Sequence, residues 1–260
     1  MTALLNYIHN SFNGGPNKSV FISNPPGPAI LLWTNSQTHP NLTGITVVRE
    51  LNLTNQNANQ QNSQNLINTI ATEIRTNTAI PFLDIEYDFL NDILVIDGTQ
   101  YNVQNGGNFI ANTFNLTVSN TSAKAVNSSQ AVTDLFHIWS RSFFSGTAVR
   151  KIDTDLVVVD TLNNTLSSFV EVKRSDRVNF NNWQPYPADL SNYKMMFALS
   201  DALNIPFYTI HHDEVGSRTI SAQKLVNVFT YDPTSPVNWN AFRSLGNRQQ
   251  LAAQATVNLL

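Results

Sequence analysis

The sequence of 260 residues contains few charges for its length. Charged residues make up 13% of it and hydrophobic residues 42%, and the formal net charge is −3. A chain of this length buries about three-quarters of the surface that its extended form exposes, which is enough for one large domain or a domain with an additional lobe. The sequence has no cysteine, which excludes disulfides, thiolate metal ligands and cysteine nucleophiles.

The sequence shows no targeting signal, so we expect an intracellular, cytoplasmic protein that does not enter a membrane. No apolar run approaches the roughly 20 residues that span a bilayer, and the first residues have neither the basic start nor the cleavage pattern of a signal peptide. The net charge of −3 argues against binding of nucleic acid by bulk attraction alone. Positive charge is nevertheless local, because six of the 15 lysine and arginine residues lie between Arg141 and Arg177.

The first 120 residues are predicted to form a β-rich region with one helix. Short apolar runs bounded by turn residues predict strands, which we place at residues 29–33, 44–50, 93–96, 101–103 and 109–118. The pair Asp97-Gly98 predicts a tight hairpin turn, because glycine supplies the positive φ that such turns need. Leucine and isoleucine at helical spacing predict a helix over residues 63–76.

Residues 121–260 carry clearer signals and are predicted to form the core of the protein. Apolar residues at helical spacing predict helices over residues 129–144 and 188–203. Apolar runs predict strands, which we place at residues 152–160, 166–173, 205–211 and 225–231. The sum is an α/β (α+β) protein in which residues 1–120 are packed on the core or supply recognition of a partner. A single continuous domain is the alternative.

Three acids and a lysine stand out on two of the predicted strands, namely Asp153, Asp155, Glu171 and Lys173. Residues two apart in a strand face the same side, and the short connection makes the two strands neighbours, so the acids can converge. Carboxylates within a few ångströms of one another repel, and without a cation at least one of them would be protonated. Oxygen ligands of this kind favour Mg²⁺, with Mn²⁺ as a substitute.

A lysine beside a carboxylate-bound cation points to hydrolysis of a phosphodiester. Protonated Lys173 cannot bind the metal, but it can orient a nucleophilic water or stabilise the negative charge of a pentacovalent phosphate. The alternative interpretation is that Glu171 and Lys173 are solvated residues on one exposed face of a strand.

These residues resemble a known signature. Asp155, the apolar run after it, and Glu171-Val172-Lys173 sixteen residues later are similar to the motif of the PD-(D/E)XK nuclease superfamily. That superfamily includes type II restriction endonucleases, Holliday-junction resolvases and repair nucleases. The context also matches, since basic residues, a predicted helix and another apolar strand follow, and the resemblance covers about residues 150–212. Thr154 stands where many members have proline.

The resemblance implies a restriction-endonuclease-like core, with a mixed central sheet flanked by helices. It also implies that Asp155, Glu171 and the backbone carbonyl of Val172 bind Mg²⁺, and that Lys173 positions or activates water. Asp155, Glu171 and Lys173 are thus the implied catalytic residues. Asp153 is the reserve candidate for the first acid, and Asp155 is preferred because the apolar run begins immediately after it.

Members of the superfamily usually have a helix and a strand ahead of the first acid, and two predicted helices compete for this place. The helix over residues 63–76 would bring Glu73 as an additional metal ligand. The helix over residues 129–144 is the rival, and it would make residues 80–118 a neighbouring lobe.

Several residues near the motif are candidates for contacts with DNA. The basic candidates can bind phosphates, and they are Arg150, Lys151, Arg174 and Arg177. Trp183 and Tyr186 can stack on bases or, as the favoured alternative, fill space under a loop. The run His211-His212-Asp213-Glu214 has the composition of a metal site, but its place at the end of a predicted strand favours solvated polar residues.

The function predicted from these features is that of a metal-dependent endonuclease that hydrolyses double-stranded DNA, most like a type II restriction enzyme. Cleavage of a palindrome needs two sites related by a two-fold axis, which implies a homodimer, and a cognate DNA methyltransferase is expected as a genetic partner. Residues 1–120 would then supply DNA recognition. One alternative is a structure-specific nuclease, such as a junction resolvase or a repair enzyme. The other is a non-enzymatic protein, such as a viral or phage structural β-protein.

Overall fold

The computed structural model describes residues 3–12, 17–23, 28–35, 41–51, 58–119, 135–146, 148–175, 180–213 and 220–260. Over these residues the protein is a mixed α/β protein, about 39% helix and 34% strand, with seven α-helices and two six-stranded mixed sheets. The chain divides into two compact units. We call Met1–Ile22 with Thr154–Leu260 the discontinuous unit, and Ser23–Asp153 the inserted unit.

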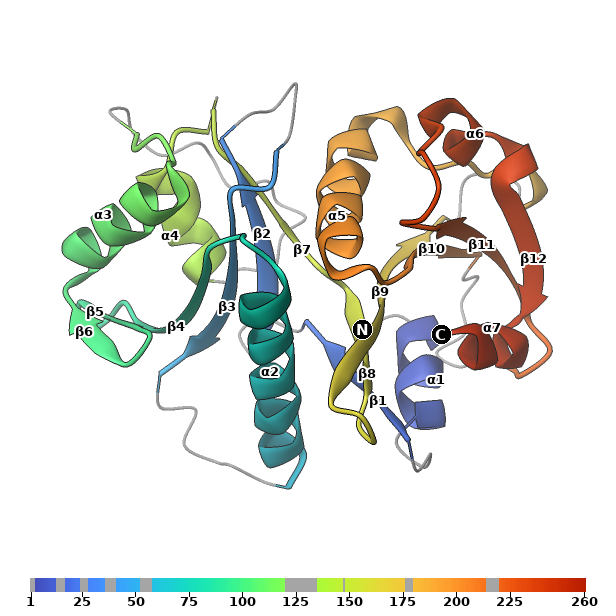
Figure 1. Ribbon diagram of the computed structural model, residues 1–260, viewed down its shortest axis with the longest axis horizontal. Helices are drawn as coiled ribbons and strands as arrows, with labels where there is room; N and C mark the ends of the chain where they lie inside the picture. Colours follow the sequence, from blue (N-terminus) through green and yellow to red (C-terminus); the bar gives the residue numbers. More distant parts are fainter. Residues whose placement is uncertain are drawn as a thin grey trace. The chain divides into compact units, whose positions relative to one another are not determined.

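The discontinuous unit is built on a sheet with the strand order β1-β8-β9-β10-β11-β12. Its strands are β1 (Lys18–Ile22), β8 (Leu156–Asp160), β9 (Thr165–Arg174), β10 (Phe207–His212), β11 (Leu225–Tyr231) and β12 (Arg248–Ala252). Neighbouring strands are antiparallel except β9 and β10, which are parallel. In Figure 1, helix α5 (Leu190–Leu203) covers one face of this sheet, and α1 (Ala3–Phe12) and α7 (Ala253–Leu259) lie on the other.

Side chains alternate along these strands and so divide between the two faces of the sheet. Aliphatic residues such as Val170 and Ile210 belong to the apolar cluster that includes residues of α1 and α7. The opposite face carries aromatic residues that meet α5 and α6 (Trp239–Arg243), and the ring centroids of Phe229 and Phe242 are 5.7 Å apart. Short 3₁₀ turns also belong to this unit, namely η1 (Phe180–Asn182), η2 (Pro187–Asp189) and η3 (Leu245–Asn247).

The inserted unit has a second sheet with the strand order β6-β5-β4-β3-β2-β7. Its strands are β2 (Ala29–Thr34), β3 (Gly44–Glu50), β4 (Phe82–Asp88), β5 (Ile93–Ile96), β6 (Thr99–Tyr101) and β7 (Arg150–Asp153). Only β3 and β4 are parallel neighbours among these strands. Figure 1 shows α2 (Ala58–Asn77) on one side of this sheet, and α3 (Val103–Phe114) and α4 (Leu135–Phe143) on the other.

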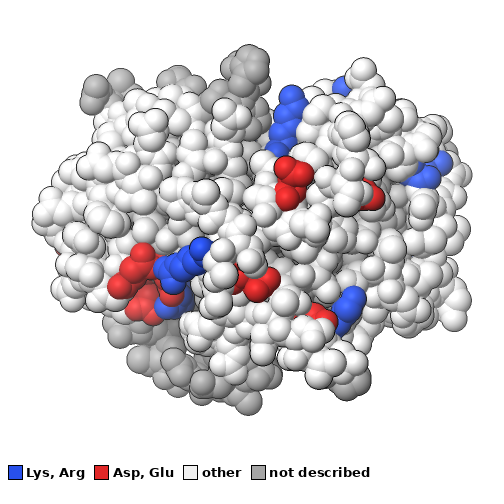
Figure 2. Space-filling model, viewed as in Figure 1, with Lys and Arg blue, Asp and Glu red and all other residues white. Residues whose placement is uncertain are grey.

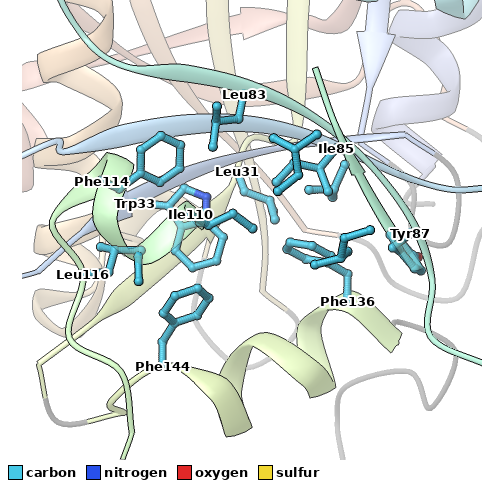
Figure 3. Packing of buried hydrophobic residues seen from close by; sticks show 14 of the residues in the cluster. Leu31, Trp33, Leu83, Ile85, Tyr87, Ile110, Phe114, Leu116, Phe136 and Phe144 are labelled. Atoms are coloured by element: carbon cyan, nitrogen blue, oxygen red, sulfur yellow. The ribbon is translucent and has the colours of Figure 1, made fainter. Parts of the chain in front are cut away.

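An aromatic cluster joins α3 and α4 to the sheet of the inserted unit. Figure 3 shows Trp33 of β2 among Phe114, Phe136 and Phe144, whose ring centroids lie 6.4, 6.4 and 5.2 Å from that of the indole. The indole N–H of Trp33 donates a hydrogen bond to Thr46 Oγ1 (3.0 Å). The cluster therefore buries large apolar rings without leaving this polar atom unpaired.

Most of the predicted elements are confirmed. The predicted strands that coincide with observed ones lie at residues 29–33, 44–50, 93–96, 166–173, 205–211 and 225–231. The helix predicted over 63–76 lies within α2, and the one predicted over 188–203 corresponds to α5. The hairpin turn at Asp97-Gly98 is also present, with φ of 48° and 80° at these two residues, although its second strand, β6, ends at Tyr101.

The strand predicted over residues 109–118 is wrong, because most of this segment belongs to helix α3. Asn102 caps the helix by accepting a hydrogen bond from the Asn105 N–H (2.8 Å). Asn115 ends it in the left-handed conformation. The helix can pack closely because it carries glycine at Gly107, where a Cβ atom would overlap the ring of Phe143. The asparagine caps and the glycine therefore favour a helix here, although the apolar run had predicted a strand.

The single strand predicted over residues 152–160 is also wrong, since two strands in different sheets occupy it. Residues up to Asp153 belong to β7, which pairs with β2 of the inserted unit. Residues from Leu156 belong to β8, which pairs with β1 and β9 of the discontinuous unit. The alternation rule predicted that Asp153 and Asp155 share one face of one strand. They do not, because Asp153 ends β7 and Asp155 lies just ahead of β8.

The division into units differs from the predicted boundary between residues 120 and 121, because it falls at residues 22/23 and 153/154. The helix predicted over 129–144 corresponds in part to α4, and its residues 129–134 lie outside the described residues. Within the part of the chain that the structure describes, no helix is both long and apolar enough to cross a membrane.

Candidate active site

Glu171 and Lys173 lie on β9, an interior strand of the discontinuous unit, next to β8 on one side and β10 on the other. Because they are two residues apart in a strand, both side chains lie on the same face of the sheet. The Lys173 ammonium nitrogen lies 2.7 Å from Glu171 Oε1. Glu171 is only 7% exposed. The two residues thus form an ion pair in which the carboxylate is buried and the lysine is half-buried, and the interpretation of a solvated strand face does not hold for Glu171.

Asp155 joins this pair from the residue just ahead of β8. Its Oδ2 accepts a hydrogen bond from the Val172 N–H (2.6 Å), so the carboxylate lies against the backbone between Glu171 and Lys173. In a strand, the N–H and C=O of one residue point toward the same neighbouring strand. The Val172 carbonyl therefore lies on the Asp155 side, and the structure brings Asp155, Glu171, Val172 and Lys173 together.

Asp189 and Tyr193 also belong to the site, and sequence reasoning missed their role in it. Asp189 ends η2 directly ahead of α5, and its Oδ2 lies 3.4 Å from the Lys173 ammonium. Tyr193 lies one helical turn later, with its ring centroid 5.9 Å from the same nitrogen. A signal was available, since a helix that connects two parallel strands begins near the carboxyl end of the first. This rule could have placed the residues that open α5 beside Lys173, but it was not applied.

Charge is unevenly distributed at this site. The carboxyl groups of Asp155, Glu171 and Asp189 accompany one ammonium group. Burial by itself lowers the pKa of Lys173, but the nearby Glu171, Tyr193 and Asp189 more than compensate, so this pKa is raised and the ammonium stays charged at neutral pH. Burial raises the pKa of Tyr193, which keeps its hydroxyl neutral. An excess of carboxyl groups around one lysine is the kind of setting in which a cation is stabilised.

The oxygen atoms of this site can supply part of the coordination of a magnesium ion. Among the described residues, no group of three or more His, Cys, Asp or Glu side chains is arranged to hold a metal. Asp155, Glu171 and the Val172 carbonyl instead offer two carboxylates and one carbonyl. Mg²⁺ in proteins is often held by one or two carboxylates, and water and phosphate oxygens complete its coordination. This set therefore fits Mg²⁺ or Mn²⁺ in the presence of a phosphate substrate, and it does not form an all-protein cage.

Two further residues predicted as metal ligands belong to the inserted unit, namely Asp153 on β7 and Glu73 on α2. The predicted solvated end of β10 is wrong, because His211 and His212 are fully buried. They are not part of a metal cluster among the described residues.

The residues predicted to contact DNA lie in different places. Arg150 and Lys151 are half-buried on β7 of the inserted unit, and Lys151 Nζ lies 2.8 Å from His137 Nδ1. Arg174 is exposed at the end of β9, and Arg177 lies outside the described residues. Figure 2 shows a face of the molecule on which lysine and arginine are few, and several of them lie against acidic side chains. On that face, binding of DNA by bulk charge is not favoured.

Trp183 and Tyr186, the two aromatic candidates for stacking on bases, differ in exposure. Trp183 is 0% exposed, and its indole stacks on the imidazole of His211. It fills space under the connection between β9 and α5, as the packing alternative predicted. Tyr186 is 40% exposed and remains available to a ligand.

Comparison of the chain with protein-family models, with curated proteins and with solved structures gave no match. The geometry and chemistry of the site are therefore the basis of the functional proposal.

Proposed function

We propose that the protein is a metal-dependent endonuclease that hydrolyses phosphodiester bonds of double-stranded DNA at specific sequences, as type II restriction enzymes do. The observation that carries the proposal is the buried Glu171–Lys173 pair with Asp155 beside it on the Val172 amide.

The order of elements around the site supports the same proposal. The resemblance implied that the strands with the acids are followed by a helix and a parallel strand, and β9 is followed by α5 and by β10, which is parallel to β9. It also implied a helix and a strand ahead of the first acid. In the discontinuous unit α1 and β1 precede Asp155, and β1 pairs with β8. This makes α1 a better candidate for that helix than residues 63–76 or 129–144.

In the proposed reaction, water attacks the scissile phosphorus in line with the leaving 3′ oxygen, and the products carry a 5′-phosphate and a 3′-hydroxyl. Asp155, Glu171 and the Val172 carbonyl would hold Mg²⁺, with Mn²⁺ as a substitute. When bound, such an ion supplies Lewis-acid stabilisation of the phosphate and lowers the pKa of a bound water.

Lys173 has the second role in this mechanism. Because its ammonium stays charged, it donates hydrogen bonds and cannot act as a base. It can orient the attacking water and stabilise the negative charge that develops on the phosphate oxygens. Its contacts with Glu171 (2.7 Å) and Asp189 (3.4 Å) restrict the ammonium to the space beside the carboxylates.

Digestion of a mixed-sequence plasmid with and without EDTA tests the proposal. Mg²⁺-dependent conversion to discrete fragments is the expected result. A smear, or cleavage only of branched DNA, would instead favour the structure-specific nuclease, and an intact plasmid under all conditions would favour the non-enzymatic alternative. A sequence-specific enzyme that cuts a palindrome is also expected to act as a homodimer and to be encoded with a DNA methyltransferase.

Variants identify the residues responsible. Glu171→Ala and Lys173→Ala are each expected to lower cleavage by at least about 100-fold, since each removes a group that stabilises the transition state. Binding of duplex DNA should change little. Lys224→Ala is the matched control, because Lys224 forms an ion pair with Asp213 at the same distance, 2.7 Å, elsewhere in the same unit. Cleavage by both site variants at the rate of the control would rule out the assignment.

A further inference from the structure

One row of polar side chains crosses the sheet of the discontinuous unit and ends at the candidate site. Lys173 on β9 lies opposite His211 on β10, which in turn lies opposite Asn227 on β11. Asn227 lies opposite Gln250 on β12. Residues that are opposite one another on neighbouring strands point to the same face of a sheet. These four side chains, which we call the polar row, therefore share the face that carries Glu171.

His211 contacts the segment that leads into α5, residues 180–189. Its imidazole stacks on the indole of Trp183, with 4.1 Å between ring centroids and 2° between ring planes. The ring of Phe180 lies 5.9 Å away. Burial, and to a lesser extent the neighbouring His212, lowers the pKa of His211 to about 4, so the ring is neutral at physiological pH. A neutral imidazole can lie flat in this aromatic setting without burying a charge.

Asn227 and Gln250, the next two members of the polar row, bind the same segment, one through a backbone carbonyl and the other through an amide side chain. Asn227 Nδ2 donates to the carbonyl oxygen of Phe180 (2.8 Å) and lies 3.1 Å from His211 Nδ1. Gln250 Nε2 donates to Asn181 Oδ1 (3.0 Å). Side chains from three neighbouring strands therefore hold η1 and Trp183 against the sheet.

The segment that the polar row holds delivers Asp189 to the site. Trp183 meets the ring of Tyr186 edge-on, with 6.0 Å between centroids. The Tyr186 carbonyl oxygen accepts a hydrogen bond from the Asp189 N–H (3.0 Å). The Asp189 carboxylate then lies 3.4 Å from the Lys173 ammonium. A continuous series of contacts thus runs from His211 through the segment and back to Lys173.

We propose that His211 is a positioning residue, which holds residues 180–189 on the sheet and so keeps Asp189 against Lys173. The residue does not touch the reacting atoms in this account. The proposal deepens the nuclease assignment and rests on it for the catalytic consequence. His211 contributes ring stacking on Trp183, while Asn227 and Gln250 contribute hydrogen bonds to Phe180 and Asn181. Together these contacts fix a segment that lacks regular secondary structure apart from two short 3₁₀ turns.

Two measurements on His211→Ala test the proposal in the full-length protein. The first is amide hydrogen exchange over residues 180–189, which does not depend on activity. The second is the single-turnover rate of plasmid cleavage with Mg²⁺ at saturating DNA, together with DNA affinity. Gln250→Ala is a second variant from the exposed end of the polar row, where folding is least at risk. Gln249→Ala is the matched control, because Gln249 is the adjacent exposed residue of β12 and points to the opposite face.

We expect exchange in residues 180–189 to become at least about 10-fold faster in His211→Ala and to be measurably faster in Gln250→Ala. Gln249→Ala should behave as the wild type. The cleavage rate of His211→Ala should fall about 10- to 100-fold with DNA affinity within about two-fold, as for a displaced catalytic group. In an Asp189→Asn background, His211→Ala should cause no further loss, because both changes act through one contact.

Unchanged exchange in both row variants would overturn the proposal whatever the activity. The proposal would also be overturned if the loss of cleavage rate in Asp189→Asn/His211→Ala equalled the product of the losses in the two single variants. That result would mean that His211 acts independently of Asp189. A wild type that cuts no DNA, with exchange faster as expected, would remove the nuclease assignment while leaving the role of His211 in holding the segment.

Discussion

Replacement of Lys173 by methionine separates the structural part of the site from its chemistry. Methionine keeps most of the length of the side chain, but it leaves the Glu171 carboxylate, which is 7% exposed, without its partner at 2.7 Å. Removal of one partner from a buried ion pair costs about 3–5 kcal/mol. The side chain of Lys173 retains 21% exposure, so we expect a somewhat smaller loss in the free energy of unfolding, about 2–4 kcal/mol.

Urea unfolding monitored by circular dichroism provides the assay, with Lys224→Met as control. The side chains of the Lys224–Asp213 pair are 39% and 31% exposed, and pairs of this kind contribute about 0–1 kcal/mol. The double variant Glu171→Gln/Lys173→Met should recover a large part of the stability, because the more buried of the two carboxylates that contact Lys173 is then neutral. Equal, small losses for Lys173→Met and Lys224→Met would show that the Glu171–Lys173 pair contributes no more than an exposed pair. A double variant no more stable than the single one would show that Glu171 is not left as a costly unpaired charge.

The raised pKa of Lys173 also determines how the difference in free energy of unfolding between the wild type and Lys173→Met depends on pH. A group whose pKa is higher in the folded state contributes its full stabilisation below the pKa of the unfolded chain, which for lysine is about 10.4. That contribution decreases as the pH rises toward the folded-state pKa. The stability difference between the wild type and Lys173→Met should therefore be constant from about pH 7 to pH 9 and should shrink only above about pH 10.4.

Three further predictions concern single side chains. Gly107→Ala should lower the free energy of unfolding by about 1–3 kcal/mol, because the new Cβ overlaps Phe143. Gly246→Ala is the control and should be nearly neutral, because its Cβ would lie 3.6 Å from its nearest neighbour. Similar urea midpoints for the two variants would count against close packing of Gly107 on Phe143. Tyr193→Phe should not lower stability, because the buried hydroxyl has no hydrogen-bond partner among the described residues, and a clear loss in thermal unfolding would disprove this. Asp155→Asn should weaken Mg²⁺ activation of cleavage about 10- to 100-fold, and an unshifted Mg²⁺ titration would exclude Asp155 as a ligand.

The part of the site that was predictable from the sequence depends on local pattern. The run Leu166–Lys173 ends in Phe169, Val170 and Val172 interleaved with Glu171 and Lys173, so strand β9 and the shared face of these two charged residues follow from its pattern. The short turn before β9 makes β8 its neighbour, and this places Asp155 beside Glu171. These inferences needed only residues within twenty positions of one another.

The remaining features depend on pairing between distant parts of the chain. Nothing between Asp153 and Asp155 indicates that β7 pairs with β2 while β8 pairs with β1. Neither glycine nor proline separates the two strands, so the sequence predicts a single strand. The discontinuous unit takes its first helix and strand from Met1–Ile22, about 130 residues ahead of β8 in the sequence, and local periodicity cannot report such a contact.

His211 illustrates a related limit. A histidine at the end of a strand is usually solvated, and the sequence around it contains further polar residues. The structure covers this end with the segment that follows β9, where Trp183 stacks on the ring. Its burial is thus decided by a connection more than twenty residues away in the sequence.

Diffraction from crystals soaked in Mn²⁺ would show whether Asp155 and Glu171 bind a divalent cation. We expect an anomalous difference peak within about 2.5 Å of a carboxylate oxygen of both residues. The peak should be lost in crystals of Glu171→Gln. A map with no peak between these carboxylates, or with peaks only at carboxylates elsewhere in the chain, would contradict the account.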